Sequence, residues 1–289
     1  MNKNLTIIFN AYFSSKNLYR ILKTLTKFKI IIIENSRDKK LKLNLEKKYS
    51  NVTVLIPNKN LGLAKGYNLG IKCAKTKYVF LNNPDIEISN RSINQLILCA
   101  QKIKKFSIIS PIYKDEKIFK NYSGEQSIKN KDYFFLKNKI RLVNWIDNNF
   151  FIERKKIKKN LFDENYFLYF ETLDFCLNLK KKYNDLFISK KIKFKHYGSM
   201  STDKKYQDIV LLTRAWHYNW SKFYYYRKNF NYVYALKKIL PNLIQAIKKV
   251  LINAVKFNKF YTYLSLIEIY GIISSVLCLK SFYRPKTEN

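Results

Sequence analysis

Acidic residues are scarce in this chain of 289 residues. Asp and Glu number 20 against 56 Lys and Arg, which gives a formal net charge of +36. This balance favours an anionic partner such as nucleic acid, anionic lipid or a phosphorylated substrate. The basic residues are spread along the chain without a like-charged tail, and no module rich in base-stacking residues is visible. We therefore do not expect nucleic acid as a partner.

Cysteine is also sparse. Four cysteines lie far apart, with no CxxC motif and no Cys/His cluster, which argues against structural zinc. Reduced thiols in a cytoplasmic protein are the simplest interpretation. The opening MNKNLTIIFNAYF is too short and too polar after its apolar core to be a signal peptide, and it is better interpreted as a first strand.

Internal repeats, a Gly/Ser linker, GxGxxG and a P-loop are all missing. What is present is an alternation of short apolar runs and helical patterns, which predicts a doubly wound α/β unit over about the first 100 residues. The expected elements are strands over 5–9, 29–33, 52–56 and 77–81, and helices over 15–28, 39–49 and 63–75. Small residues on one side of the 63–75 helix, Gly66, Gly70 and Ala74, permit close packing on a sheet.

The later part of the chain is less regular. A helix over 92–104 and a strand over 107–110 are followed by residues 112–144, which carry no clear pattern. We expect a further helix over 167–182 and a strand over 187–194, with only helices from residue 232 onward.

Three early strands end in polar groups. They are followed by Asn10-Ala11-Tyr12, Glu34-Asn35-Ser36 and Asn82-Asn83-Pro84-Asp85. The carboxyl ends of parallel strands converge on one crevice, where such groups suit a nucleotide. The alternative is that these are ordinary polar turns. A glycine-containing turn, Asn58-Lys59-Asn60-Leu61-Gly62, opens the 63–75 helix and is suited to close approach of a phosphate or sugar.

Two acids, Glu171 and Asp174, lie three residues apart and share one helix face. Either carboxylate could take a proton from an attacking hydroxyl, although acids at a helix start are also favoured by the macrodipole alone. His196 follows the 187–194 strand and could ligate a metal together with Asp85, although a lone histidine is more often a surface or packed residue.

Four segments stand out in order along the chain. They are NLG…GYNLG from Asn60, FLNNPD from Phe80, FDE…FLYFE…D from Phe162, and His196…Ser199…Ser201. Taken together, they resemble glycosyltransferase family 2. The closest likeness is to its rhamnosyltransferase-like branch, which builds cell-surface polysaccharides. The resemblance covers about residues 5–230. It implies a Rossmann-like GT-A fold, a nucleotide-sugar donor and an inverting reaction in which a carboxylate deprotonates the acceptor.

The resemblance also implies roles for individual residues. Asp85 would hold Mg²⁺ or Mn²⁺ on the donor diphosphate, His196 would lie near that metal, and Glu34 would contact the nucleoside. The full set expected to bind the donor is Tyr12, Glu34, Asn60, Gly62, Lys65, Asn68, Asn83 and Asp85.

Two departures from the family pattern stand out. The second acid of the helix-start motif is replaced by Thr172, which cannot act as a base near neutral pH. Either Glu171 or Asp174 then takes the proton, or the protein is a degenerate, non-catalytic binder of a nucleotide-sugar or glycan. The usual small Gly-Ala acceptor segment reads Asp147-Asn148-Asn149-Phe150, and we expect Asp147 to contact the acceptor.

The expected division is a catalytic domain over 1–230 and a helical region over 231–289. A basic amphipathic helix over 236–254 is suited to an anionic membrane surface, or alternatively to packing on the catalytic domain or a partner subunit. Pro241 either starts this helix or kinks a longer one. Residues 261–282 predict a second interfacial helix or a span, with Glu268 costly at mid-bilayer. We expect peripheral attachment to the inner face of the cell membrane and a glycan or lipid-linked acceptor.

Overall fold

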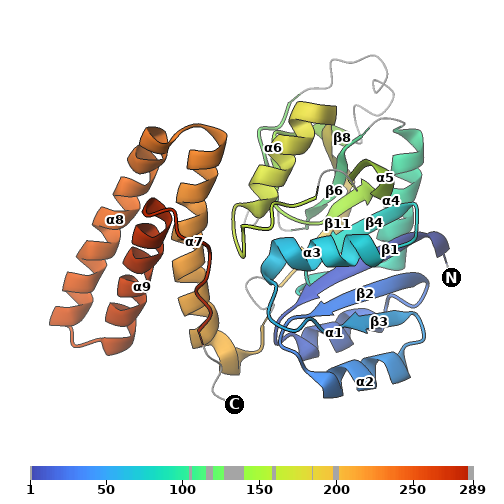
Figure 1. Cartoon of the computed structure of the whole chain (residues 1–289). Helices are drawn as coiled ribbons and strands as arrows, with labels where there is room; N and C mark the ends of the chain where they lie inside the picture. The colour runs from blue at the N-terminus through green and yellow to red at the C-terminus, as the bar shows by residue number, and fades with distance from the viewer. Residues whose placement is uncertain are drawn as a thin grey trace. The chain divides into compact units, whose positions relative to one another are not determined.

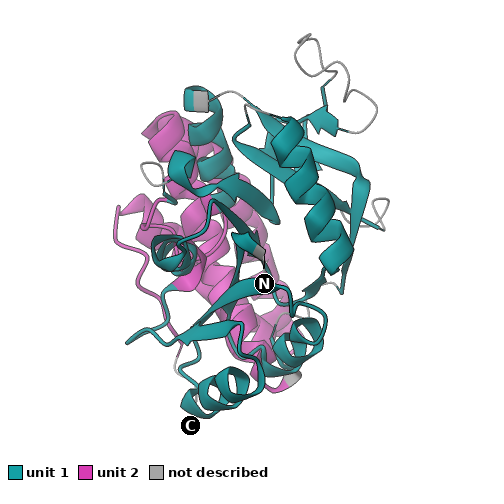
Figure 2. Cartoon of the chain, turned by 90° about the vertical axis from the view of Figure 1, so that its right-hand side faces the viewer, with its two compact units in different colours: residues 1–61, 65–162, 172–203 teal, residues 62–64, 163–171, 204–289 magenta. Residues whose placement is uncertain are grey.

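The structure is a computed structural model that describes residues 2–103, 106–114, 120–126, 140–157, 161–183, 185–197 and 202–285. It divides into two compact units, coloured separately in Figure 2. Unit 1 comprises residues 1–61, 65–162 and 172–203, and unit 2 comprises residues 62–64, 163–171 and 204–289. The predicted boundary at residue 230 differs from this division, because helix α7 groups with the helices that follow it.

The amino-terminal half alternates strands with helices, as predicted. Its elements in order are β1 (Asn2–Ala11), α1 (Ser15–Leu22), β2 (Phe28–Glu34), α2 (Lys39–Lys48), β3 (Val52–Leu55), α3 (Gly62–Cys73), β4 (Tyr78–Asn82), β5 (Ile86–Glu87) and α4 (Asn90–Lys102). Helix α1 is shorter than predicted and ends at Leu22, so residues 23–27 form the turn into β2 (Figure 1).

The second half contains shorter strands. They and their helices are β6 (Ile108–Tyr113), β7 (Tyr122–Ser123), β8 (Ile140–Leu142), β9 (Trp145–Ile146), β10 (Phe150–Glu153), α5 (Arg154–Ile157), α6 (Glu171–Tyr183) and β11 (Leu186–His196). The predicted strand over 107–110 continues through Pro111 to Tyr113. The predicted helix over 167–182 begins at Glu171 instead, because Tyr169 and Phe170 have positive φ angles of 69° and 63°.

A nine-stranded sheet forms the centre of unit 1. Its order is β3-β2-β1-β4-β10-β6-β11-β5, with β8 paired to β11. Strands β3, β2, β1 and β4 run parallel, β10 is antiparallel to both of its neighbours, and β6 and β11 are again parallel. Strands β7 and β9 form a separate two-stranded sheet.

Helices pack on both faces of this sheet because successive strand residues point to opposite sides. On one face, Ile7 and Phe9 of β1 join a core cluster with residues of α1, α2 and α4. On the other face, α3 packs so closely over β1 that a Cβ atom at Gly70 would collide with Ile8, and one at Gly66 would collide with Asn10. The predicted role of these glycines in close packing is confirmed.

The helical part of unit 2 contains a 3₁₀ turn (Lys204–Tyr206) and helices α7 (Gln207–Asn229), α8 (Tyr232–Val255) and α9 (Lys259–Val276). These helices pack on one another around Trp216, Trp220 and Phe223 of α7, with Ile239 of α8 and Ile267 of α9 (Figure 1). The prediction of an all-helical segment from residue 232 is confirmed.

Helix α8 is longer than predicted, and Pro241 lies inside it rather than at its start. The apolar stretch after residue 261 forms α9, in which Glu268 pairs with Lys249 of α8 at 2.9 Å. Across the described ranges, no helix combines the length and apolar character needed to cross a membrane. The interfacial interpretation of these helices stays a prediction.

Candidate active site

The carboxyl edge of the sheet gathers most of the predicted site residues. Ala11 at the end of β1 aligns with Glu34 at the end of β2, and Phe9 of β1 aligns with Asn82 at the end of β4. In a parallel sheet these ends open onto the same crevice. The predicted convergence of the first, second and fourth strands on one edge is therefore present in the fold.

Three further segments reach the same edge through the sheet topology. Strand β10 is antiparallel to β4 and begins with Phe150 opposite Leu81, so the residues that precede β10 lie at the carboxyl end of β4. Asn149 adopts a φ of 63°, a left-handed conformation that asparagine tolerates better than most residues, at this turn. Strands β6 and β11 end at Tyr113 and His196.

Asp85 and His196 lie next to each other at this edge. Ile86 pairs with His196 across β5 and β11, which brings the preceding carboxylate to the imidazole. The Oδ2 atom of Asp85 lies 3.4 Å from Nε2 of His196, and the Asp85 side chain is only 5% exposed.

The donor atoms here suit a hard divalent ion that is shared with a ligand. Oδ1 of Asp85 and Oδ1 of Asn82 are buried and lack hydrogen-bond partners within the described residues. A buried polar atom without a hydrogen-bond partner lowers the stability of the fold unless a bound ion or ligand supplies the missing partner. Within those same ranges, no group of three or more His, Cys, Asp or Glu could enclose a metal alone. One carboxylate fits Mg²⁺ or Mn²⁺ when phosphate and water supply the remaining ligands.

A chain of contacts leads from this pair to Asp147. The rings of His196 and Tyr113 stack with centroids 4.8 Å apart and planes 8° from parallel. Tyr113 donates its hydroxyl proton to Oδ1 of Asn148 at 2.6 Å, and Nδ2 of Asn148 donates to Oδ2 of Asp147 at 3.2 Å. The hydroxyl of Thr172 lies near the Asp147 carboxylate and lowers its pKa. The metal-ligand candidates and the acceptor candidate therefore belong to one connected cluster.

Asp147 is held from its backbone as well. Its N–H donates to the carbonyl of Asn121 at 2.8 Å. Burial raises the pKa of Asp147, while the nearby His196 and the Thr172 hydrogen bond act in the opposite direction. Burial likewise raises the pKa of Tyr113, so the phenol stays protonated and donates to Asn148.

The acids predicted from the helix-start motif both lie at the beginning of α6. Glu171 is 4% exposed, and Asp174 is 1% exposed and accepts a hydrogen bond from Nδ2 of Asn178 at 3.1 Å. Thr172 between them is 6% exposed. The residue Asp147 is partly exposed, whereas Glu171 and Asp174 are buried.

The segment before α6 belongs to unit 2 and is fastened there by α7. Asp163 accepts hydrogen bonds from Nζ of Lys228 at 2.7 Å and from the hydroxyl of Tyr224 at 2.9 Å. The carbonyl of Leu168 accepts from Ser221 at 2.8 Å. These contacts hold the chain on either side of Tyr166 and Phe167 immediately before the two positive-φ residues that lead into Glu171.

Glu34 is fully buried at the end of β2. Burial raises its pKa to about 7, although hydrogen bonds from the hydroxyl and backbone N–H of Ser36 to Oε1 partly offset this rise. Oε2 is buried without a hydrogen-bond partner in the described part of the chain. An unpartnered carboxylate oxygen at the sheet edge suits a hydroxyl or N–H donor from a nucleoside.

The other predicted donor residues have local contacts that explain their positions. Asn83 accepts from the hydroxyl of Tyr67 at 2.9 Å. Asn68 bonds to both the N–H and the carbonyl of Phe162, a contact that explains its burial within unit 1. The carbonyl of Tyr12 accepts from Thr202 at 3.1 Å.

The turn before α3 is organised by two asparagines at the predicted strand ends that were not included in the predicted donor-binding set. Nδ2 of Asn35 donates to Asn10, and its Oδ1 accepts from the N–H of Leu61 at 2.9 Å. This bond fixes the neighbouring Asn60. Gly62 has a φ of 72°, which favours glycine, and the next residue donates its N–H to the carbonyl of Phe167 inside unit 2.

Lys65 lies in the first turn of α3 and is partly exposed. The remaining elements of the predicted pattern, Ser199 and Ser201, lie outside the described residues. The assignments of all these side chains to donor, acceptor and metal remain predictions.

Strands β3, β2, β1 and β4 of the central sheet are parallel, and most of the predicted site residues gather at its carboxyl edge. Together with the helical carboxyl-terminal segment, this sheet defines a GT-A type fold of the nucleotide-sugar transferases. Residues 6–187 match the family model described as Glycosyl transferase family 2, so the chain belongs to that family and is a glycosyltransferase. None of the curated proteins matches the sequence.

Solved structures agree on the fold. The mannosyltransferase PcManGT from Pyrobaculum calidifontis, in complex with GDP-Man and Mn²⁺, superposes with a TM-score of 0.54 at 10% identity, covering 96% of this chain and 88% of its own. GalNAc-T7 with UDP, GalNAc and Mn²⁺ gives 0.54 at 13% identity, covering 84% and 57%. S. aureus TarS gives 0.50 at 13% identity over 95% of this chain. This chain spans only 55% of that TarS chain.

Proposed function

We propose that this protein is an inverting, metal-dependent glycosyltransferase that moves a sugar from a nucleotide-sugar donor to a glycan or lipid-linked acceptor of a surface polysaccharide. A hexosyl or rhamnosyl transfer is the expected type. The observation that carries the proposal is the Asp85–His196 pair at the carboxyl edge of the sheet, with its buried and unpartnered Asp85 oxygen.

Asp85 and His196 would hold Mg²⁺ or Mn²⁺ against the donor diphosphate. When bound, the metal supplies positive charge that stabilises the departing nucleoside diphosphate. The Mn²⁺ complexes of PcManGT and GalNAc-T7 support a divalent ion in this role. Their GDP-Man and UDP, with the UDP-GlcNAc of a TarS complex, support a nucleotide-sugar as the donor class.

The nucleoside end of the donor would lie at the ends of β1 and β2. The unpartnered Oε2 of Glu34 would accept a hydrogen bond from the nucleoside, and Tyr12 follows the adjacent strand. The turn before α3, with Asn60 and Gly62, would approach the donor through its backbone, and Lys65 would add a positive charge.

Transfer with inversion needs one displacement and one proton acceptor. The acceptor oxygen attacks the anomeric carbon from the face opposite the diphosphate, and a carboxylate takes the hydroxyl proton. Glu171 and Asp174 are the two carboxylates that the helix-start motif provides for this role, and Asp147 would contact the acceptor.

The exposed surface of α8 and α9 supports attachment to an anionic membrane on its cytoplasmic side. Along α8, the exposed apolar residues recur at helical spacing as Leu240, Ile244, Ile247 and Leu251, which are 45% to 62% exposed. Val255 at the end of α8 and Phe257 in the turn into α9 are 78% and 90% exposed. Contiguous exposed apolar surface on this scale is uncommon in a protein that stays free in water.

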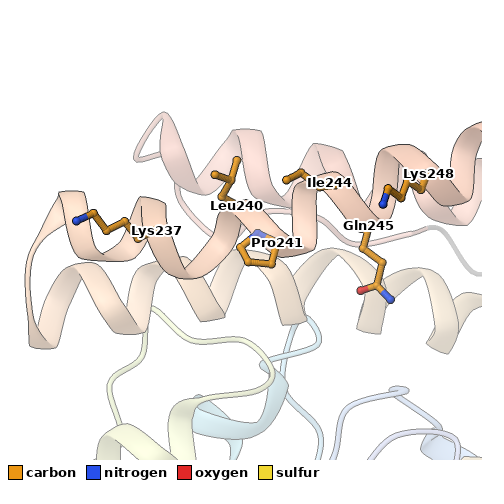
Figure 3. Close-up of a pocket in the computed structure, with 6 residues that line it drawn as sticks. All are labelled: Lys237, Leu240, Pro241, Ile244, Gln245 and Lys248. Carbon is orange, nitrogen blue, oxygen red and sulfur yellow. The ribbon is translucent and has the colours of Figure 1, made fainter.

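Lysines accompany this apolar surface. Lys237 and Lys248 line a shallow pocket on α8 together with Leu240, Pro241 and Ile244 (Figure 3). Each Lys near an anionic surface contributes on the order of 1 kcal/mol to binding. An interfacial helix pair with cationic flanks would hold the enzyme beside a lipid-linked acceptor without a membrane span.

The test is a screen of UDP-, GDP- and dTDP-sugars by thermal shift, followed by an assay of nucleotide release. A donor present at 100 times its dissociation constant should raise the free energy of unfolding by about 2.7 kcal/mol. Nucleotide release from that donor should require Mg²⁺ or Mn²⁺ and stop with EDTA. Donor binding without metal-dependent release would instead identify the non-catalytic binder that the Thr172 departure suggests.

A further inference from the structure

The carboxylates of Glu171 and Asp174 in α6 and of Asp147 near it are the three candidates for the base. The three residues differ in how far they are exposed to solvent. Asp174 is 1% exposed and already accepts a hydrogen bond from Asn178, while Glu171 is 4% exposed. A general base must come within hydrogen-bond reach of the proton that it removes. Of these three residues, Asp147 is the one that is partly exposed.

Asp147 also has the surroundings that a positioned base needs. Nδ2 of Asn148 donates a hydrogen bond to its Oδ2 at 3.2 Å, and the Thr172 hydroxyl lies near the same carboxylate. Each carboxylate oxygen has two lone pairs, and capacity to accept a further proton therefore remains. Its backbone N–H is held by Asn121, so the turn itself is anchored.

The position of Asp147 relative to the metal candidates supports the same role. Asn148 connects Asp147 to Tyr113, whose ring stacks on His196, and His196 contacts Asp85. The group that would receive the proton and the groups that would hold the leaving diphosphate are thus parts of one connected cluster on the sheet edge. All of them belong to unit 1, so their mutual placement does not depend on unit 2.

We infer that Asp147, rather than an acid of the helix-start motif, is the general base of this enzyme, and that Thr172 is the hydroxyl that orients it. This inference rests on the proposed function. The Asp147 carboxylate takes the proton from the acceptor hydroxyl as that oxygen bonds to the anomeric carbon. The bond from the anomeric carbon to the diphosphate oxygen breaks, and its electron pair leaves with the nucleoside diphosphate. The proton then passes from Asp147 to solvent.

The first experiment compares Asp147→Asn, Glu171→Gln and Asp174→Asn with the intact protein. The probes are UDP-GlcNAc, GDP-mannose and dTDP-rhamnose with Mn²⁺, and the readout is nucleotide release with water as the acceptor. Asp147→Asn should lower kcat by roughly a hundredfold or more, the usual contribution of general base catalysis, with donor Kd unchanged. The two motif variants should retain more activity. Asp208→Asn, an exposed acid in α7, is the matched control.

The second experiment replaces the neighbouring Thr172 with an acid. Thr172→Asp in the Asp147→Asn background places a carboxylate beside the lost one, and at least a tenfold recovery of kcat is expected. If kcat does not recover, Asp147 contacts the acceptor or supports the fold without acting as the base, and the inference is overturned. The same holds if Asp147→Asn alone keeps kcat within about threefold of the intact protein.

Failure of the inference is separable from failure of the proposed function. If the intact protein releases no nucleotide from any donor, the proposed function fails, and the assignment of Asp147 fails with it. If the intact protein turns over and Asp147→Asn does so equally, only the inference is wrong. Circular dichroism and thermal unfolding of each variant separate loss of catalysis from loss of fold.

Discussion

The sheet edge of unit 1 and the exposed surface of α8 and α9 in unit 2 differ from most globular proteins in opposite ways, one in what it buries and the other in what it exposes. At the sheet edge, polar side chains are buried, and Asp85 and Glu34 each keep one oxygen without a partner among the described residues. On α8 and α9, apolar side chains such as Leu251 and Leu266 face solvent. Each arrangement is costly in the isolated chain, and each is relieved by a different kind of ligand.

The difference lies in the binding energy that each region would supply. A buried carboxylate recognises a small, charged ligand through few strong contacts, so a single substitution should remove the function. An exposed apolar surface with lysines acts through many weak contacts, so single substitutions should have graded effects. The predictions run from the first kind to the second and then to a property of the fold itself.

The largest expected effect follows Asp85→Ala. Losing the single carboxylate of the proposed metal site should lower metal-dependent nucleotide release by roughly a thousandfold, because metal catalysis supplies several kcal/mol. The fold should persist, since the backbone carbonyl of Asp85 still accepts from the N–H of Tyr197. Steady-state kinetics over a range of Mn²⁺ concentrations measure the effect. Turnover at the rate of the intact protein would remove Asp85 from the metal site.

A smaller effect is expected when Leu240 and Ile244 of α8 are both replaced by glutamine. They are 53% and 46% exposed, so the fold should tolerate the change while binding to vesicles loses about 1 kcal/mol per side chain. Affinity for phosphatidylglycerol vesicles should fall roughly tenfold or more in a sedimentation assay. Leu43→Gln, at a 68% exposed leucine of α2, is the matched control.

Salt provides a second way to examine the same surface. Binding of the intact protein to those vesicles should weaken as salt rises from 0.1 M to 0.5 M, because screening shortens the reach of the lysines to a few ångströms. Equal binding by the intact protein and the double variant would show that α8 is not the anchor.

Removing everything after residue 230 is a poorer test of the membrane surface, since it would expose Phe223, which packs with Ile239 and Ile272.

The last prediction concerns Glu34 and the pH dependence of stability. Its pKa is about 7 in the folded protein against an ordinary value of 4.5, so the folded state binds the proton more tightly than the unfolded state does. Stability should therefore fall as pH rises from about 4.5 to 7, by about 3 kcal/mol in total. Glu34→Gln should lack this loss, so its advantage over the intact protein should grow between pH 5 and pH 8 in denaturant unfolding. A constant difference across that range would contradict the burial of this carboxylate.

Local patterns predicted much of unit 1 correctly. Apolar runs such as Ile30 to Ile33 form strands of the expected position, and Gly66 and Gly70 allow α3 to approach β1 as expected. The predicted GT-A fold is confirmed by the family match over residues 6–187 and by the solved structures. Periodicity works here because buried parallel strands and the helices that cover them have unmistakable spacing.

Boundaries that depend on tertiary contacts were predicted less well. Helix α6 begins at Glu171, four residues after the expected start, because Tyr169 and Phe170 take left-handed conformations in a segment held by α7. Pro111 lies within β6, so the strand reaches Tyr113, which local rules did not suggest. This extension brings Tyr113 to His196, a contact that no spacing in the sequence reveals.

By itself, the sequence determined the alternation of strands and helices, the carboxyl-edge acids of β2 and β4, and the cationic, amphipathic character of the last helices. These depend on the period of apolar residues and on residue chemistry, which are local properties. Only the tertiary structure decided that Asp147 meets Thr172 and connects through Asn148 and Tyr113 to His196. These residues come from β6, β11, α6 and the turn before β10, and the antiparallel insertion of β10 between β4 and β6 brings them together. Strand pairing over such sequence distances is fixed by the packing of the whole sheet, which no local pattern encodes.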